Sequence, residues 1–471
     1  MKKLSLTILF FLVIVISHAQ WQGDIRLTND TNFSSTSFNN ARSLGVSGNM
    51  LHVIWSDDRD GNREIYYKQS ADQGLSWGND IRLTADSSTS IFPSICVSGL
   101  QVHVVWEEYR DGNSEIYYKN SMDGGMTWSS DMRLTFNSSN SFSPSVAVSD
   151  SVVHVAWFDQ RDGNNEIYYK RSPDAGATWA TDARITNDNA ASVFPSVSVS
   201  GQQVHIAWEE YRDGNGEIYY KRSPDAGISW GSDTRLTFNI SNSFSPCVFA
   251  DGLLMNIVWH DERDGNQEIY SKRSPDGGIS WGSDARLTND SSVSNYPAVC
   301  ISGSNVHVTW FDERDGNAEI YYKRSIDGGL TWANDTRLTF DAARSTDPAI
   351  AVSNTIVHIL WTDARDNFPV YTGNYEIYYK RDSTANVTSI ETAVMNETAE
   401  PVIYPNPAYD FIQVSKRDEK DNSEIEILNA FGEIILVTKN QRIDISRIQN
   451  GIYIVKMHFV DRIKISKFIK I

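Results

Sequence analysis

Tryptophan recurs in this chain at a fixed step of 51 residues, and this spacing constrains the fold more than any other feature. Around each of these tryptophans the chain repeats Val-His-Val-x-Trp, an acid two residues further on, Arg-Asp-Gly-Asn and Glu-Ile-Tyr-Tyr-Lys, with few departures. The series is Trp55, Trp106, Trp157, Trp208, Trp259, Trp310 and Trp361, and a second series with the same step is Trp77, Trp128, Trp179, Trp230, Trp281 and Trp332. A period of this size with short alternating strands predicts a β-propeller or a solenoid.

Each repeat divides into four short strands. In the third repeat they are expected at 144–148, 152–157, 166–170 and 178–186, with turn-forming Ser, Asp, Gly and Asn between them. Four antiparallel strands of this length make one propeller blade. The sequence therefore predicts an all-β chain whose main part is a seven-bladed β-propeller.

The turn after the third strand repeats six times as Ser-x-Asp-x-Gly-x-x-Trp, for example from Ser172 to Trp179. This motif resembles the Asp-box of bacterial neuraminidase repeats, and the chain is therefore similar to sialidase-like Asp-box propellers. The resemblance implies that the box is structural and lies away from any active site. Its aspartates are Asp72, Asp123, Asp174, Asp225, Asp276 and Asp327.

The seventh repeat lacks its Asp-box and its fourth strand after Arg381, but residues 21–28 match residues 77–84. We expect this N-terminal segment to be the outer strand of the seventh blade, which would close the ring over residues 20–381. Closure removes an open sheet edge that would otherwise invite aggregation.

The first 19 residues read as a signal peptide: Lys2 and Lys3 precede the apolar run 4–16, and small residues follow it. No other apolar stretch approaches the ~20 residues that a membrane-spanning helix needs. We expect the mature chain to begin at Gln20 and to be exported.

Residues 382–400 are rich in Ser, Thr, Asn, Ala and Glu and are predicted to be a linker. The segments 404–410, 425–432 and 450–456 within 401–471 resemble the C-terminal sorting domain of type IX secretion in Bacteroidetes-type bacteria. The resemblance implies a small β-sandwich that the outer-membrane export machinery recognises. It also implies a secreted or surface-attached protein that has crossed the periplasm and the outer membrane.

The formal net charge is −18 and the pI is about 4.9, which argues against nucleic acid as a partner. Cys96, Cys247 and Cys300 follow prolines in apolar runs and are expected to be buried small hydrophobes. The histidines three residues before the blade tryptophans are expected to be hydrogen-bonded core residues rather than metal ligands. We expect a monomer.

The hairpin between the second and third strands carries the repeated charged residues. Its arginines are Arg59, Arg110, Arg161, Arg212, Arg263, Arg314 and Arg365. Three hypotheses remain open. The arginines rigidify the hairpin by pairing with neighbouring acids; or they bind sugars together with Tyr109, Phe158, Tyr211 and Phe311; or the acids bind Ca²⁺. The candidate calcium ligands are Asp60, Asp111, Asp162, Asp213, Asp264 and Asp315.

Sialidases use an Arg-Ile-Pro motif and a unique set of Arg, Tyr, Glu and Asp residues, and this chain has no Arg-Ile-Pro. A catalytic acid and nucleophile need different environments, whereas the charged residues here recur in most blades. The sequence favours a non-catalytic module that binds glycans or cell-surface polymers. The alternatives are a sialidase-like glycoside hydrolase or polysaccharide lyase, and a structural adhesin.

Symmetry fails where the ring closes. The seventh hairpin (366–375) is expanded, and the link into the first blade (29–41) is long. A unique ligand site, if the chain has one, is expected at this seam, with Tyr371, Tyr375, Phe33 and Phe38 as contacts.

Overall fold

The computed structural model describes residues 21–37, 42–367, 374–384, 403–404, 408–414, 424–429, 434–440, 442–458 and 463–470. The predicted signal peptide and most of the predicted linker lie outside these ranges. By its contacts the chain divides into two compact units, Met1–Thr388 and Ser389–Ile471. In the described residues no helix is long and apolar enough to cross a bilayer.

The first unit consists of seven antiparallel sheets, which are the predicted blades. In blades 1 to 6 the strands follow each other from the inside of the ring outward in chain order. Blade 1 contains β2 (Ser34–Ser35), β3 (Leu44–Ser47), β4 (Met50–Asp57), β5 (Glu64–Ser70) and β6 (Ile81–Arg82). Here β2 and β3 both pair with β4 and together make the inner strand. The all-β propeller prediction is confirmed.

The next three blades share one pattern of lengths. Blade 2 contains β7 (Ser90–Ser98), β8 (Gln101–Glu108), β9 (Glu115–Ser121) and β10 (Met132–Arg133). Blade 3 contains β11 (Ser141–Ser149), β12 (Val152–Asp159), β13 (Glu166–Ser172) and β14 (Ala183–Arg184). Blade 4 contains β15 (Ser192–Ser200), β16 (Gln203–Glu210), β17 (Glu217–Ser223) and β18 (Thr234–Arg235).

The last three blades keep these lengths. Blade 5 contains β19 (Ser243–Asp251), β20 (Leu254–Asp261), β21 (Glu268–Ser274) and β22 (Ala285–Arg286). Blade 6 contains β23 (Ser294–Ser302), β24 (Asn305–Asp312), β25 (Glu319–Ser325) and β26 (Thr336–Arg337). Blade 7 contains β27 (Ser345–Ser353), β28 (Ile356–Asp363), β29 (Glu376–Asp382) and β1 (Ile25–Arg26), with a 3₁₀ turn, η1 (Arg365–Asn367), after β28.

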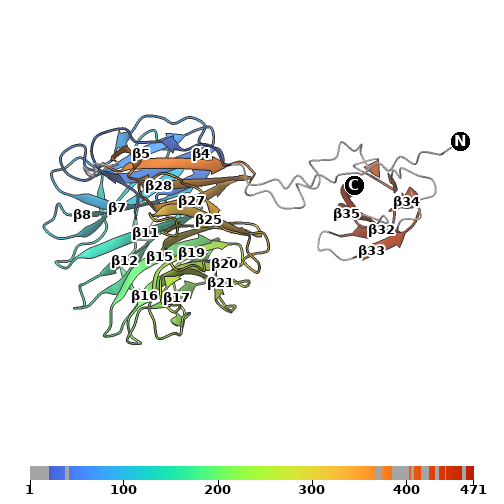
Figure 1. The fold of residues 1–471 in the computed structure, drawn as a ribbon. Coiled ribbons are helices and arrows are strands. Elements are labelled where there is room, and N and C mark those ends of the chain that lie inside the picture. The colour runs from blue at the N-terminus through green and yellow to red at the C-terminus, as the bar shows by residue number, and fades with distance from the viewer. Residues whose placement is uncertain are drawn as a thin grey trace. The chain divides into compact units, whose positions relative to one another are not determined.

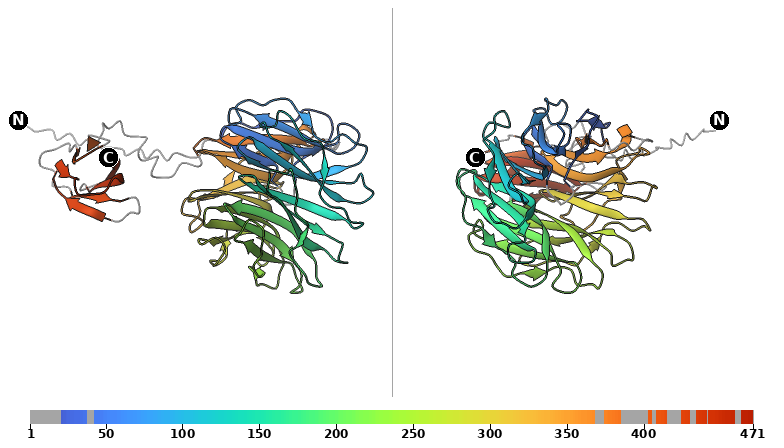
Figure 2. Two further views of the ribbon diagram at one scale, coloured as in Figure 1. Left: turned by 180° about the vertical axis from the view of Figure 1, so that it is seen from behind. Right: turned by 90° about the vertical axis from the view of Figure 1, so that its left-hand side faces the viewer.

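The N-terminal strand closes the ring, as the sequence predicts. β1 pairs antiparallel with β29, so that Ile25 faces Tyr379. Asp24 adds ion pairs of 2.6 Å to Arg365 and 2.8 Å to Lys380. The right-hand view of Figure 2 shows the blades following one another around the ring, with the first beside the last. The two ends of the propeller are thus held in one sheet (Figure 1).

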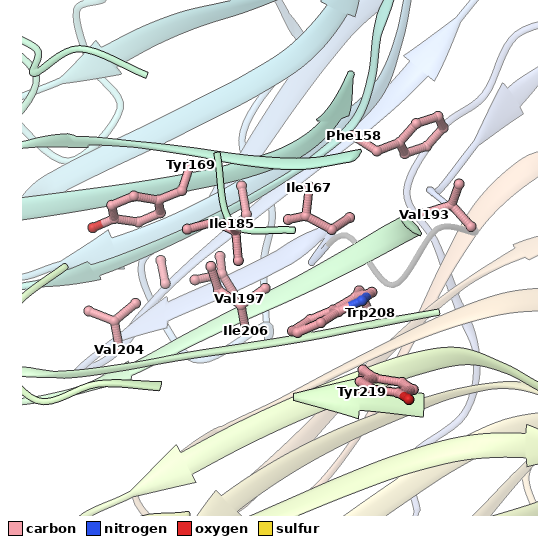
Figure 3. Close-up of a cluster of buried hydrophobic side chains, with 12 residues drawn as sticks. Phe158, Ile167, Tyr169, Ile185, Val193, Val197, Val204, Ile206, Trp208 and Tyr219 are labelled. Atoms are coloured by element: carbon pink, nitrogen blue, oxygen red, sulfur yellow. The ribbon is translucent and has the colours of Figure 1, made fainter. Parts of the chain in front are cut away.

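The core lies between neighbouring blades. Each blade tryptophan, such as Trp208, is fully buried, because its ring fills the space between its own sheet and the preceding one. Figure 3 shows one such layer, in which Ile167 and Tyr169 of blade 3 meet Val197 and Ile206 of blade 4. Each sheet buries large apolar side chains on both of its faces, which explains why hydrophobic residues occupy odd and even positions of the strands alike.

The inner strands of all seven blades surround a central channel. It contains a cavity of about 200 Å³, lined among others by Val46, Val97, Val148, Val199 and Ile301. All three cysteines are free and buried, as predicted. Cys96 and Cys300 line this cavity, and Cys247 lines a second cavity that shares Arg42 and Ile350 with it.

The second unit contains two small sheets around one apolar core. One sheet has β30 (Ile403–Tyr404), β31 (Phe411–Val414) and β34 (Arg442–Asp444); the other has β32 (Glu424–Leu428), β33 (Ile434–Thr438), β35 (Gly451–His458) and β36 (Ile463–Lys470). Ile412, Ile427, Ile443 and Val455 pack together between the sheets. This is the predicted small β-sandwich.

Candidate functional site

Each hairpin arginine is bound by the acid two residues before it. In blade 3, Arg161 donates to Asp159 from Nε at 2.9 Å and from NH2 at 2.6 Å, and its backbone N–H donates to the same carboxylate at 3.0 Å. Trp157 Nε1 donates to Asp159 at 3.0 Å. Burial alone would raise the pKa of Asp159, but these hydrogen bonds outweigh it and the pKa lies below its usual value.

A second carboxylate, from an aspartate just before the outer strand, also binds the guanidinium. Asp182 accepts from Arg161 NH1 at 2.7 Å and pairs with Lys170 at 2.8 Å. The arginine also lies over the ring of Tyr168, 4.2 Å from its centroid. The equivalent acids are Asp24, Asp80, Asp131, Asp233, Asp284 and Asp335. Sequence reasoning missed this group, although six of its seven members recur with the same 51-residue step.

The arrangement matches the rigid-hairpin hypothesis, because each arginine is paired with acids of its own blade. Four arginines also pair with an aspartate in the link from the preceding blade, and these aspartates are Asp30, Asp86, Asp188 and Asp290. Ligand binding by the seven arginines remains a prediction. About a fifth to a quarter of each arginine side chain is accessible, for example 22% of Arg161 and 27% of Arg212, so these arginines present guanidinium edges at the hairpin face.

The candidate calcium ligands are also engaged by neighbouring side chains. Asp111 accepts a hydrogen bond of 2.6 Å from the Tyr117 hydroxyl and pairs with Arg133 at 3.1 Å. The same tyrosine and arginine contacts surround Asp60, Asp162, Asp213, Asp264 and Asp315. Among the described residues no cluster of His, Cys, Asp or Glu is arranged to hold a metal ion. The geometry gives calcium binding no support.

The Asp-boxes form the turns on the opposite face of the ring. Asp174 accepts hydrogen bonds from the Thr178 N–H at 2.7 Å and from the Thr178 hydroxyl at 2.6 Å, and Ser172 Oγ donates to Asp174 at 2.8 Å. The contacts of Asp174 lie within the turn itself, which fits the structural role that the resemblance implies.

The histidine ring is part of the core, as predicted. His154 Nδ1 lies 2.6 Å from the Tyr169 hydroxyl, and both residues are buried. Burial lowers the pKa of His154 to about 3, so the imidazole is neutral at physiological pH.

At the seam, Phe33 and Tyr375 pack edge to face, with 5.1 Å between ring centroids. Arg63 lies over Phe33, 5.0 Å from its centroid. The structure therefore brings together two of the four predicted seam residues, while Phe38 and Tyr371 lie outside the described residues.

The aromatic residues expected to bind sugars divide into two kinds. Tyr109 and Tyr211 are 38% and 36% exposed, whereas Phe158 and Phe311 are buried in aromatic clusters beside the channel.

A further set of aromatic residues is more exposed and was missed from the sequence. Phe136, Phe238 and Phe340 are 71–72% exposed in the links that follow the outer strands of blades 2, 4 and 6. Their neighbours Arg133, Arg235 and Arg337 lie over these rings, at 5.1, 4.9 and 4.8 Å from the centroids. The signal in the sequence is a Leu-Thr-Phe that recurs every 102 residues, twice the blade period.

The mouth of the channel breaks the symmetry of the ring. The residue after each blade tryptophan differs from blade to blade: it is Ser56, Glu107, Phe158, Glu209, His260, Phe311 and Thr362. A bulge in the inner strand places a non-glycine residue at positive φ before each proline, and these residues are Phe92, Ser143, Phe194, Ser245, Tyr296 and Asp347. These positions are not found from the repeat pattern, because their residues differ from blade to blade.

Three carboxyl groups at this mouth have raised pKa values. Burial raises the pKa of Glu107 and of Glu209 to about 7, although each accepts a backbone N–H, from Ser143 at 2.6 Å and from Ser245 at 3.2 Å. Burial raises the pKa of Asp347 to about 6. Each of these groups exchanges its proton near neutral pH, as acid–base groups do.

Asp347 and Tyr296 line a narrow cavity of about 20 Å³, together with Arg42. Arg42 takes the place that proline has in the other inner strands. Its NH2 donates to the Val248 carbonyl at 3.2 Å and its guanidinium lies 4.8 Å from the Phe249 centroid. Burial lowers the pKa of Arg42.

Two parts of the chain match known families. Residues 110–308 match the BNR repeat-like domain, and residues 402–471 match the secretion system C-terminal sorting domain. Among curated proteins no sequence match is found.

One solved structure supports the fold. The polysaccharide lyase Uly1 superposes with a TM-score of 0.54 at 7% identity, over 77% of this chain and 99% of its own. The endosialidase of phage phi92 (TM-score 0.47, 10% identity, 95% and 87% covered) and the GH93 α-L-arabinofuranosidase of Fusarium graminearum (0.46, 13%, 65% and 98%) are more distant. At 7% identity the likeness to Uly1 concerns the fold alone.

The sorting domain directs export by type IX secretion to the cell surface or the extracellular space. The chain carries a sialidase-like Asp-box β-propeller followed by a type IX C-terminal sorting domain.

Proposed function

We propose that this protein is a secreted, non-catalytic module that binds glycans or cell-surface polymers on the hairpin face of its propeller. The observation that carries the proposal is the set of three exposed, arginine-backed rings of Phe136, Phe238 and Phe340. Single exposed apolar side chains are ordinary, but three equivalent rings, each backed by an arginine, form a repeated surface feature that suggests a ligand.

Each ring is held in place from behind. Arg133, which lies over Phe136, is itself fixed by Glu115 at 2.7 Å and Asp111 at 3.1 Å. The ring is thereby oriented before a ligand arrives, which lowers the entropy lost on binding. The apolar C–H face of a sugar carries partial positive charge and is attracted to the negative face of an aromatic ring.

Polar groups suited to sugar hydroxyls surround the same links. Asn137 follows Phe136, and Asn113 of the adjacent hairpin donates to the Asn137 carbonyl at 3.3 Å. Hydroxyls that approach the ring would meet the accessible edges of Asp111 and Arg133, which are 27% and 25% exposed. The hairpin arginines and the seam residues Tyr371 and Tyr375 would add contacts at the margin.

The spacing of the platforms favours a repeating ligand. Three identical sites on alternate blades allow one polymer chain, or several chain ends on a surface, to bind more than once, and avidity then multiplies a weak affinity. A net charge of −18 disfavours phosphate-rich polymers and favours neutral or weakly charged polysaccharides. In this proposal the protein acts as a monomer, and nucleic acid is not among its ligands.

The experiment compares polysaccharide binding of the full chain with that of F136A/F238A/F340A. The matched control is L75A/I228A/I279A, which removes three side chains that are 63–71% exposed in the Asp-box turns on the other face. Loss of binding in the first triple variant alone supports the proposal. Equal loss in both, or in neither, contradicts it.

A second candidate is catalysis at the channel mouth, as a glycoside hydrolase or polysaccharide lyase. The observation that favours it is the asymmetric set of Glu209, Tyr296 and Asp347, two of which have carboxyl pKa values raised to about 7 and about 6. Release of reducing or unsaturated sugar ends that E209Q and D347N abolish would establish it. Binding without any release would favour the first candidate.

A further inference from the structure

Blade 5 departs from the repeat at two positions that touch in the other blades. Where six blades have histidine on the second strand, blade 5 has Asn256, and where they have a second tyrosine on the third strand, it has Ser271. Ser271 Oγ lies 3.3 Å from Asn256 Oδ1, so the small pair keeps a hydrogen bond but not the aromatic rings.

In the other blades the tyrosine reaches across to the next blade. Tyr220, for example, meets the Asp-box of blade 5: a Cβ on Gly278 would lie 1.9 Å from its hydroxyl oxygen, and its ring packs edge to face on Trp281 with 5.0 Å between centroids. The same contacts recur for Tyr67, Tyr118 and Tyr169. The phenol ring is thus a fixed part of the joint between blades.

The joint between blades 5 and 6 lacks this ring, and a pocket of about 330 Å³ lies there. Its walls include Ser271, Arg273, Trp281, Gly329 and Leu330. Leu330 is 65% exposed, so the pocket reaches the surface of the Asp-box face. A cavity of about 150 Å³ already accommodates benzene, so this pocket is large enough for one substituted ring.

Polar groups at this joint have no partner among the described residues. Arg273 lines the pocket, and its buried Nε makes no hydrogen bond. Asn256, the cross-strand neighbour of Arg273, is fully buried and its Nδ2 makes none either. A buried donor without an acceptor is costly, and a ligand hydroxyl would satisfy one.

We propose that this pocket binds a phenolic ring, which takes the place of the missing tyrosine side chain. The hydroxyl would accept from Arg273 Nε, and the ring would fill the space beside Ser271 and Gly329. This chemistry has two sources, a free small phenol or a tyrosine side chain on a peptide. The site is independent of the hairpin-face platforms, so it holds whether or not the proposed glycan binding does.

The test is calorimetric titration of the full chain with p-cresol, and separately with N-acetyl-tyrosinamide. The wild-type chain is expected to bind p-cresol saturably at one site. The variant N256H/S271Y, which restores the pair found in the other blades, is expected to bind at least tenfold more weakly and to melt at a higher temperature, because its own ring fills the pocket.

A matched variant makes the opposite change. H154N/Y169S copies the blade 5 pair into blade 3 and is expected to raise the stoichiometry to two. Should that variant not fold, N256H/S271Y still decides. Binding of both probes would indicate that peptide tyrosines are ligands, and binding of p-cresol alone would indicate a free phenol. Absence of saturable binding of either probe to the wild type, or binding unaffected by N256H/S271Y, would overturn the proposal.

Discussion

Arg161 holds Asp159 through two parallel hydrogen bonds, from Nε at 2.9 Å and NH2 at 2.6 Å, and Asp159 has no exposed surface. A planar guanidinium that meets a carboxylate in this way forms the strongest type of side-chain pair. The same two bonds recur in blades 1, 5, 6 and 7, whereas in blades 2 and 4 a glutamate replaces the aspartate and accepts from NH2 alone. The repeated charges of the hairpin face thus serve first to fix the shape of that face.

Removal of Arg161 should therefore destabilise the propeller strongly. R161A leaves the Asp159 carboxylate buried without its counter-charge, which costs about 3 kcal/mol of unfolding free energy. Urea unfolding measures the loss. The control is R344A, because Arg344 is 51% exposed and its ion pair with Glu313 is long, at 3.7 Å; its effect should stay below about 0.5 kcal/mol. Equal effects of the two substitutions would contradict this account.

Two glycines with the same backbone conformation should respond differently to alanine. Gly176 (φ 91°) and Gly163 (φ 92°) both lie in the left-handed region, but a Cβ on Gly176 would lie 1.9 Å from the Tyr118 hydroxyl, whereas nothing lies within 4 Å of one on Gly163. G163A should cost about 1 kcal/mol through backbone strain alone. G176A must also displace the tyrosine and should cost about 3 kcal/mol or more. Thermal unfolding of the two variants tests this order.

The stability of the protein should depend on the charge of Glu209. Its pKa is raised on folding from 4.5 to about 7, so its contribution is complete below about pH 4.5 and is lost as the pH rises through about 7. E209Q should match the wild type at pH 5 and be more stable at pH 8, by up to about 3 kcal/mol. Urea midpoints at the two pH values measure this. E313Q, at an exposed site, serves as the control, and a pH-independent effect of E209Q would refute the assignment.

Loss of the N-terminal strand should open the ring. A chain without residues 21–28 exposes the edge of β29 and leaves Arg365 and Lys380 without Asp24. We expect the melting temperature of the propeller to fall by roughly 10 °C and the chain to self-associate through the free edge. Calorimetry and light scattering provide the readouts. The milder variant D24N should lower the melting temperature without causing association.

The fold was predictable because its determinants repeat. The 51-residue period predicted the number of blades. The likeness of residues 21–28 to residues 77–84 predicted that the N-terminal segment supplies the missing outer strand of the seventh blade. Burial of the histidines also followed, because each alternates with Val or Ile in a strand that is apolar on both faces.

The contacts of the site were harder to predict, because they depend on the order of strands in the sheet. Asp182 lies 21 positions after Arg161, and only the pairing of the outer strand brings the two together. The asymmetric residues Glu209 and Asp347 were overlooked for the opposite reason, since they stand at positions that differ between blades. The replacement of tyrosine by Ser271 points to a pocket only once Ser271 is seen to contact Asn256 on the paired strand.

The central claim is that exposed phenylalanines on the hairpin face bind a polymer. It is tested most directly by measuring the affinity of the full chain, of F136A/F238A/F340A and of the three single variants for a panel of immobilised polysaccharides. The account predicts that each single variant loses part of the avidity and that the triple variant loses binding, while its melting temperature is unchanged. Wild-type affinity in a folded triple variant would contradict it.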